Sequence, residues 1–204
     1  MKFVAVLLLL AACQDDIATP FPPGLEPLED NAVPAQPDGP FDETLRFKTS
    51  DTDVIRVYAR GFVRLPLAAL WEAAKSPTPN VSTCRTDERM VMEGNEPQYE
   101  YSFLVHYIVH DILTVEWDDQ WRFGQVTDDL AMIRHQKIQG SDFVRLSEGT
   151  IQVLATSDPE VSELAFVEHL DATTATTSDV TQGVQHNYDA LVAVAHGTPI
   201  PPCP

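Results

Sequence analysis

The sequence predicts an α+β fold in which a curved antiparallel sheet of about seven strands packs on one long C-terminal helix. Three observations support this prediction. Side chains over residues 54–65 alternate with a period of two, as in a half-buried strand. Six more strand-like segments follow between residues 81 and 171, separated by short turn-type sites. Apolar side chains over residues 179–196 recur every three or four positions, which indicates a helix with one buried face.

The chain opens with the features of a bacterial secretion signal. Lys2 precedes an apolar run over residues 3–10. This run is too short to span a bilayer, which requires about 20 apolar residues, but it is typical of a cleaved signal peptide. The motif Leu10-Ala11-Ala12-Cys13 resembles the lipobox of bacterial lipoproteins, in which the cysteine is acylated and becomes the mature N-terminus. The alternative is an ordinary signal peptide followed by an unrelated cysteine.

The lipobox resemblance implies a lipid-anchored protein of the cell envelope. Residues 1–12 are then the signal peptide and Cys13 is the lipidation site, because two or more acyl chains give a stable membrane anchor. In such lipoproteins an aspartate after the cysteine tends to mark inner-membrane retention. Gln14 stands there, so the resemblance favours the outer membrane of a Gram-negative bacterium. Residues 13–50 hold seven of the 16 prolines and show no apolar period, which predicts an extended linker.

The charge of the chain excludes one class of partner. It has 31 acidic and 13 basic residues, a formal net charge of −18 at pH 7. A field of this sign repels phosphate backbones, so we expect no nucleic-acid partner. We expect the contact with the membrane to come from the lipid anchor.

The globular domain is expected over residues 51–198. Its first strand ends at Pro66, which suits the start of a helix over 67–75. Asp118-Asp119 falls inside a strand-like segment and marks either a turn or a bulge. The six later strands are expected at 81–92, 98–110, 112–123, 129–138, 143–156 and 161–171.

The last helix has recognisable ends and one apolar stripe. Ser178 is the expected N-cap, Asp179 suits the first turn, and Gly197 stands at the C-terminal stop. The stripe must pack on the sheet, and its members are Val180, Val184, Tyr188, Leu191 and Ala195.

This order of elements resembles the START-like superfamily, also called the SRPBCC or helix-grip fold. The resemblance covers about residues 52–197 and rests on degenerate motifs. They are Val57-x-Ala59-x-Gly61-x-Val63-x-Leu65-Pro66 with Leu70-Trp71-Glu72-Ala73, and Leu146-x-x-Gly149-x-Ile151 with Leu164-x-Phe166-x-Glu168. One departure is expected: the family usually has a second short helix after the first, whereas Pro77-Thr78-Pro79 should turn almost directly into strand.

The resemblance implies a cavity between sheet and helix that holds lipids, polyketides or other apolar ligands. The leading expectation is therefore a non-enzymatic binding domain for an apolar ligand, without a cofactor. The alternatives are a START-like enzyme of cyclase or hydrolase type, and an interaction lipoprotein whose core is closed by aromatic side chains. The strand phases place these candidate side chains near the cavity: Tyr101, Phe103, Tyr107, Trp117, Trp121, Phe123 and, from the helix, Tyr188.

The remaining cysteines suggest a covalent link. With Cys13 taken by lipid, Cys84 and Cys203 form an even pair in an oxidising compartment, which predicts a disulfide. Such a bond would tie the Pro-rich tail, residues 199–204, to the domain. The alternative is two free thiols.

No pattern in the sequence indicates a catalytic or metal site. His106 and His110 are spaced i, i+4, but they fall in a strand with no third ligand evident, so no metal is expected. His169 and Asp171 share a strand face, yet no nucleophile motif accompanies them, and with His135 they are expected at the surface or in turns. The acids near one strand end are expected to be solvated: Glu116, Asp118 and Asp119.

Overall fold

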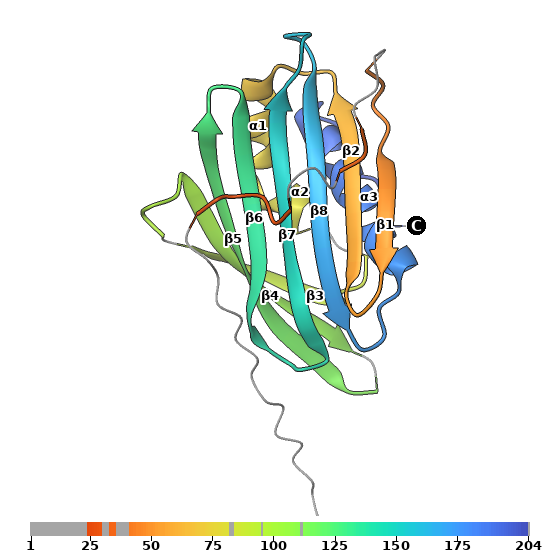
Figure 1. Ribbon diagram of the computed structural model, residues 1–204. Helices are drawn as coiled ribbons and strands as arrows, with labels where there is room; N and C mark the ends of the chain where they lie inside the picture. Colours follow the sequence, from red (N-terminus) through yellow and green to blue (C-terminus); the bar gives the residue numbers. More distant parts are fainter. Residues whose placement is uncertain are drawn as a thin grey trace, which may run out of the picture.

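The strands form one antiparallel sheet, and the helices pack on one of its faces. The computed structural model describes residues 24–29, 33–35, 41–81, 84–94, 96–110 and 112–203. Its strands lie in the order β1-β2-β8-β7-β6-β5-β4-β3 (Figure 1). The predicted α+β fold is confirmed, with eight strands rather than about seven. The elements are β1 (Arg46–Asp51), β2 (Ile55–Val63), α1 (Leu67–Ala74), α2 (Pro77–Asn80), β3 (Glu88–Glu93), β4 (Tyr101–His110), β5 (Thr114–Thr127), β6 (Leu130–Gly140), β7 (Val144–Ala155), β8 (Ser162–Ala172) and α3 (Thr177–Ala195).

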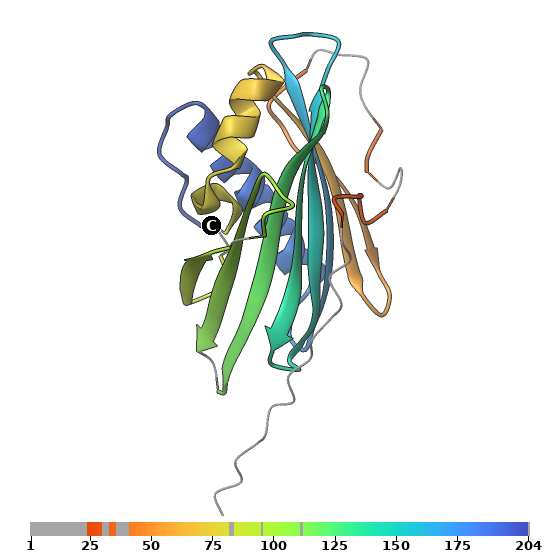
Figure 2. The same cartoon turned by 90° about the vertical axis from the view of Figure 1, so that its left-hand side faces the viewer.

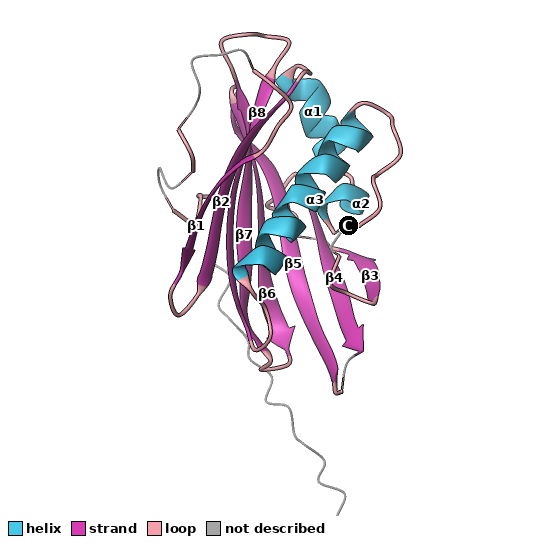
Figure 3. Ribbon diagram, turned by 90° about the vertical axis from the view of Figure 1, so that its right-hand side faces the viewer, coloured by secondary structure: helices cyan, strands magenta, loops and turns pink. Residues whose placement is uncertain are grey.

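Helix α3 lies along the face of the sheet that we call the inner face, with α1 and α2 beside it (Figure 3). It contacts β2 and β8, while α1 contacts β7. The predicted stripe is buried at Val180, Val184, Tyr188 and Leu191 and partly buried at Ala195. The gripping role predicted for the C-terminal helix is therefore confirmed.

Tyr188 fixes α3 to the sheet. Its hydroxyl donates a hydrogen bond of 2.6 Å to the carbonyl oxygen of Phe62, and its ring meets Phe166 edge-on at 6.4 Å. Gly61 makes this approach feasible, because a Cβ there would lie 2.6 Å from the tyrosine ring. The helix thus sits close to β2 only because β2 carries a glycine at this point.

The ends of the helices differ from the predictions in two places. Thr176, not Ser178, is the N-cap of α3, and it exchanges backbone and side-chain hydrogen bonds with Asp179 in a capping box. A second short helix, α2, does follow α1, so the expected departure from the helix-grip pattern is wrong. Asn187 on α3 holds α2 in place by donating hydrogen bonds to the carbonyl oxygens of Pro79 and Asn80.

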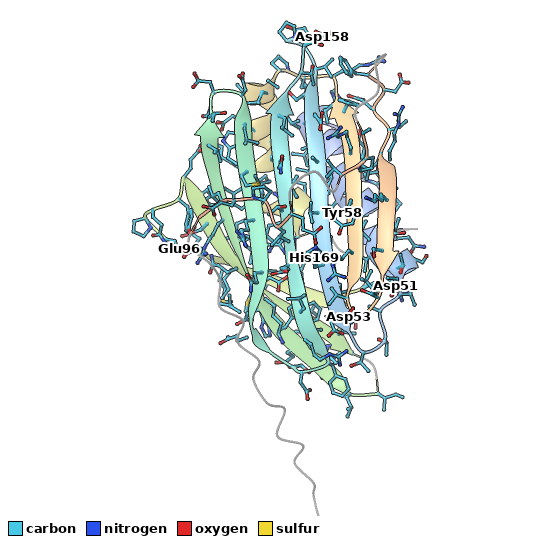
Figure 4. The ribbon with its side chains drawn as sticks, in the orientation of Figure 1. Asp51, Asp53, Tyr58, Glu96, Asp158 and His169 are labelled. Atoms are coloured by element: carbon cyan, nitrogen blue, oxygen red, sulfur yellow. A yellow bond between two sulfur atoms is a disulfide. The ribbon has the colours of Figure 1, made fainter. Side chains whose placement is uncertain are left out.

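The segment predicted as a linker contributes to the domain. Residues 46–51 pair with β2 as the edge strand β1, although the linker was expected to run to residue 50. Residues 24–29 lie across the face opposite α3, which we call the outer face (Figure 2). There Glu29 accepts a hydrogen bond of 2.7 Å from the Tyr58 hydroxyl and lies 3.0 Å from the His169 Nε2 atom. Figure 4 labels Tyr58 and His169 on this face. The described part of the linker is therefore packed against the sheet.

A register shift, a helix end and a disulfide correspond to three of the predictions. The pairing of β5 with β6 shifts register at Asp118-Asp119, and the extra residue of this bulge is Ile138 of β6. Gly197 ends α3 with a φ of 66°, which suits glycine. Cys84 and Cys203 are joined by a disulfide with Cα atoms 5.5 Å apart.

Of the helices in the described part of the chain, none combines the length and hydropathy needed to cross a membrane. Residues 1–23, including the proposed lipidation site Cys13, lie outside the described residues.

Candidate functional site

Six of the predicted candidate residues lie together on the inner face. In the pairing of β4 with β5, Tyr101 stands opposite Phe123, Phe103 opposite Trp121, and Tyr107 opposite Trp117. Directly paired residues of antiparallel strands project to the same face, so these side chains form two adjacent columns. We call these six residues the aromatic row.

The rings of the aromatic row contact one another. The ring centroids of Phe103 and Trp121 are 5.8 Å apart, and those of Tyr107 and Trp117 are 5.1 Å apart. Four of the six residues are buried, whereas Tyr101 and Trp117, at opposite ends of the row, are partly exposed. The row therefore consists of two aromatic groups with Val105 and Asp119 between them, and its two ends are partly exposed to solvent.

Tyr188, the seventh candidate, occupies a different part of the inner face. It packs over β2 and β8 through the contacts with Gly61, Phe62 and Phe166 described above. Its hydroxyl is already bonded to a backbone carbonyl, and 2% of its surface is exposed. The structure thus separates it from the aromatic row, although both belong to one apolar core.

A group of polar side chains borders the aromatic row. His135 on β6 stacks on Trp121 with ring centroids 4.2 Å apart, and its Nε2 atom lies 2.9 Å from the Glu168 Oε2 atom on β8. Asp119 on β5 accepts a hydrogen bond of 3.3 Å from the Ser147 hydroxyl on β7. We call Asp119, His135, Ser147 and Glu168 the polar cluster.

The register of the sheet brings the polar cluster together. Trp121 pairs with His135, His135 with Gly149, and Gly149 with Glu168, so these positions form one row across four strands. Gly149 separates the two charged partners and carries no side chain. A Cβ at that position would collide with both His135 and Glu168, so the glycine is what allows them to meet across β7.

The surroundings of the polar cluster change its acidity. Burial, opposed by the charge of His135 and assisted by that of Glu168, raises the pKa of Asp119 from 3.8 to about 7. Burial alone would lower the pKa of His135, but the charge and hydrogen bond of Glu168 raise it above the usual 6.5. Burial, together with the charge of Asp119, also holds the pKa of Tyr107 well above 10. The cluster therefore contains a carboxyl with a pKa of about 7 beside an imidazole with a raised pKa, and perturbed groups of this kind are typical of sites for acid–base catalysis or ligand recognition.

A buried lysine lies next to the cluster. Lys137 is paired with Asp119 across β5 and β6 and has no exposed surface. Its ammonium group donates hydrogen bonds to the carbonyl oxygens of Gly140, Ser141 and Val144 at the β6–β7 turn. Those bonds give Lys137 a structural role in closing the turn.

The structure corrects the sequence predictions for two of the acids and for two histidines. Asp118 and Asp119 are buried, not solvated, because they lie within the 14-residue strand β5, which is paired there with β4 on one side and β6 on the other. Only Glu116 is exposed as expected. His135 is buried on the inner face and His169 on the outer face, so neither lies at the surface.

The other histidines have separate partners. His106 Nδ1 lies 2.6 Å from the Asp118 Oδ1 atom, and His110 lies at the surface with Glu88, so each of the i, i+4 histidines pairs with its own acid. His169 on the outer face contacts Glu148 and Glu29, whereas its expected companion, Asp171, pairs with Arg145. The structure therefore gives no His169–Asp171 pair.

Comparisons with known proteins show similarity of overall shape only. No protein-family model and no curated protein matches the sequence. Among solved structures, the chain is similar to the Zhui aromatase/cyclase from Streptomyces sp. R1128, with 15% identity and a TM-score of 0.49 over 71% of this chain and 92% of that one. It is also similar to the lipid transfer and protein localization domain of human StarD13, with 11% identity and a TM-score of 0.45 over 79% and 91%. A protein from Thermus thermophilus aligns with 13% identity and a TM-score of 0.48 over 70% and 94%.

Proposed function

We propose that this chain is a lipid-anchored lipoprotein of the cell envelope whose START-like domain binds an apolar ligand on the inner face of its sheet. The observation that carries the binding proposal is the aromatic row with the polar cluster on its border. Sites for small molecules are lined mainly by apolar and aromatic side chains, with a few polar groups that orient the ligand. The inner face of β4–β8 has this composition.

The charges favour binding over a purely structural core. Removing a charged group from water costs several kcal/mol unless its partners compensate, and replacing a buried ion pair with apolar residues is often stabilising. His135 is buried and Glu168 half-buried, so a purely structural core would gain little from keeping this pair. A ligand that combines an apolar body with one hydroxyl or amine group would use both surfaces, because Asp119 and Glu168 can accept hydrogen bonds from such a group.

The binding proposal is tested by two variants on β4. Tyr101 lies on the inner face at one end of the aromatic row, and Leu104 is a similarly half-buried residue with its side chain on the opposite face. We expect Tyr101→Ala to weaken the binding of a fluorescent fatty-acid analogue, and Leu104→Ala to leave it unchanged. Equal binding by both variants and the wild type would rule out a site at the aromatic row. Native mass spectrometry of the mature protein extracted from membranes should also detect a copurified lipid.

An acid–base enzyme of cyclase or hydrolase type is the second candidate, and the near-neutral pKa of Asp119 favours it. The mass of the small molecule recovered with the Asp119→Asn variant distinguishes the two functions. If the domain only binds, the small molecule recovered from the variant should have the same mass as that from the wild type. If Asp119 transfers a proton in a reaction, the variant should retain a substrate whose mass differs from that of the wild-type product.

A further inference from the structure

Three potential metal ligands meet at the C-terminal tail. Cys84 lies between α2 and β3, His186 lies on α3, and Cys203 lies in the tail after α3. Their ligand atoms all fall within 4.8 Å of one another, and His186 Nε2 is 3.8 Å from Cys203 Sγ. His186 is buried, whereas Cys203 is exposed. The sequence could not indicate this group, because its members lie about a hundred residues apart from first to second.

We propose that this cluster is a redox-controlled metal site, which binds a thiophilic divalent cation of the Zn²⁺ class once the Cys84–Cys203 disulfide is reduced. A dithiol reductant supplies two electrons and two protons, cleaves the S–S bond and leaves as its own disulfide. The cation then displaces a proton from each thiol to solvent and binds two thiolates and the His186 imidazole. This proposal does not depend on the ligand-binding function.

The geometry suits such a cation. Zinc–sulfur and zinc–nitrogen bonds of about 2.3 and 2.0–2.1 Å imply ligand atoms about 3.4–3.8 Å apart in a tetrahedron. The separation of His186 Nε2 and Cys203 Sγ, 3.8 Å, already matches one edge of that tetrahedron. Once the disulfide is broken, the two sulfur atoms can move apart to the separation of two ligand atoms in the tetrahedron. Because Cys203 is exposed, water can supply the fourth ligand, as in zinc sites with three protein ligands.

The two states would hold the same segments together. The disulfide links the segment before β3 to the tail, and His186 belongs to the helix that lies between them in the chain. A bound cation would join all three segments through the same residues. Oxidation and metal binding are therefore alternative, mutually exclusive ways to fix the tail, since a disulfide offers no thiolates.

The proposal is tested by titrating the full chain with Co²⁺, which reports thiolate ligands by charge-transfer absorption in the near ultraviolet. A Cys13→Ser background leaves Cys84 and Cys203 as its two thiols. After reduction with a dithiol and anaerobic removal of the reductant, we expect saturation at equimolar Co²⁺, and loss of the band when Zn²⁺ is added. The oxidised chain should give no band. Absence of the band in the reduced chain would overturn the proposal.

Two histidine variants identify the third ligand. His186→Asn should bind Co²⁺ at least tenfold more weakly, whereas His196→Asn, which changes the exposed histidine paired with Glu43, should bind like the parent. Equal affinities of the two variants would overturn the role of His186. A measurement on the parent chain is independent of variant folding: Zn²⁺ should slow the alkylation of both thiols by iodoacetamide, and unchanged alkylation rates would contradict the site.

Discussion

Replacing Asp119 with asparagine should remove a pH-dependent loss of stability from this domain. In the folded protein the pKa of Asp119 is about 7, against 3.8 for an ordinary aspartate. Between these pH values the unfolded chain releases the proton while the folded chain retains it. The folded state therefore binds more protons, so the free energy of unfolding falls as pH rises from about 4 to 7 and then levels off. Asparagine has no proton to lose and should be free of this effect.

The expected size follows from the same two values. Each tenfold change in proton affinity corresponds to about 1.4 kcal/mol, so full ionisation of Asp119 costs about 4 kcal/mol of unfolding free energy. Part of that cost is already present at pH 5. The advantage of Asp119→Asn over the wild type should therefore grow by about 2–3 kcal/mol between pH 5 and pH 8. His135, whose pKa is raised in the fold, adds stability that is complete below pH 6.5 and is lost as pH rises through its folded pKa, so the wild-type slope has the same sign.

Urea unfolding followed by tryptophan fluorescence at pH 5, 6.5 and 8, with the disulfide intact, measures this difference. Asp118→Asn is the matched control, because it changes the neighbouring buried carboxyl on the outer face, where Asp118 bonds to His106 and Gln139. We expect Asp118→Asn to retain the wild-type pH dependence. If the free-energy difference between Asp119→Asn and the wild type is the same at pH 5 and pH 8, the argument for a proton held by Asp119 is wrong.

Three further outcomes are expected. Leu191→Ala removes a fully buried side chain from the interface of α3 with the sheet and should cost about 2–5 kcal/mol, whereas Val194→Ala, at a half-buried position, should cost less; equal losses in urea unfolding would contradict a gripped helix. Thr176→Ala removes one side of the capping box of α3 and should lower the free energy of unfolding by about 1 kcal/mol, a loss that an unchanged urea midpoint would exclude. Cys13→Ser should abolish incorporation of radiolabelled palmitate and the membrane-bound fraction, and equal membrane fractions in mutant and wild type would refute lipidation.

Periodicity within single elements made much of the fold predictable. The alternation over residues 54–65, the aromatic residues of β4 and β5 and the stripe of α3 each repeat within one segment, so the sequence reveals the buried face directly. The aromatic row was predictable for a second reason. Strands β4 and β5 follow one another in the chain and pair as neighbours, as consecutive strands usually do.

Elements that bury little apolar surface escaped the sequence analysis. Strand β1 is almost entirely exposed and has no apolar side to generate a period, so it could not be distinguished from the linker. Residues 24–29 hold to the outer face through individual polar contacts, such as those of Glu29 with Tyr58 and His169. Contacts of this kind depend on where the sheet presents its partners, and that is not encoded near residue 29.

The polar cluster was missed because its geometry arises from register. Asp119, His135, Ser147 and Glu168 come from four different strands, and each looks like an ordinary surface residue within its own segment. The regular alternation of β5 places Asp119 on the inner face with Trp117 and Trp121, and the register shift opposite it leaves Ile138 of β6 without a partner. Gly149 then supplies the gap through which His135 reaches Glu168. A polar residue beside a glycine on the next strand is a signal only when the pairing of the strands is known.

The position of this cluster bears on whether the inner face is a core or a site. An ion pair retained only for stability would be expected where its desolvation is slight, since burial is costly and apolar replacements are often better tolerated. His135 is instead buried against the indole of Trp121, and Asp119 has its proton affinity raised by the same surroundings. These desolvated groups lie beside the aromatic row, between the partly exposed rings of Tyr101 and Trp117. A ligand with one polar group could there form hydrogen bonds with the acids and cover the rings at the same time. This coincidence of buried charge and apolar surface supports ligand binding over a closed core.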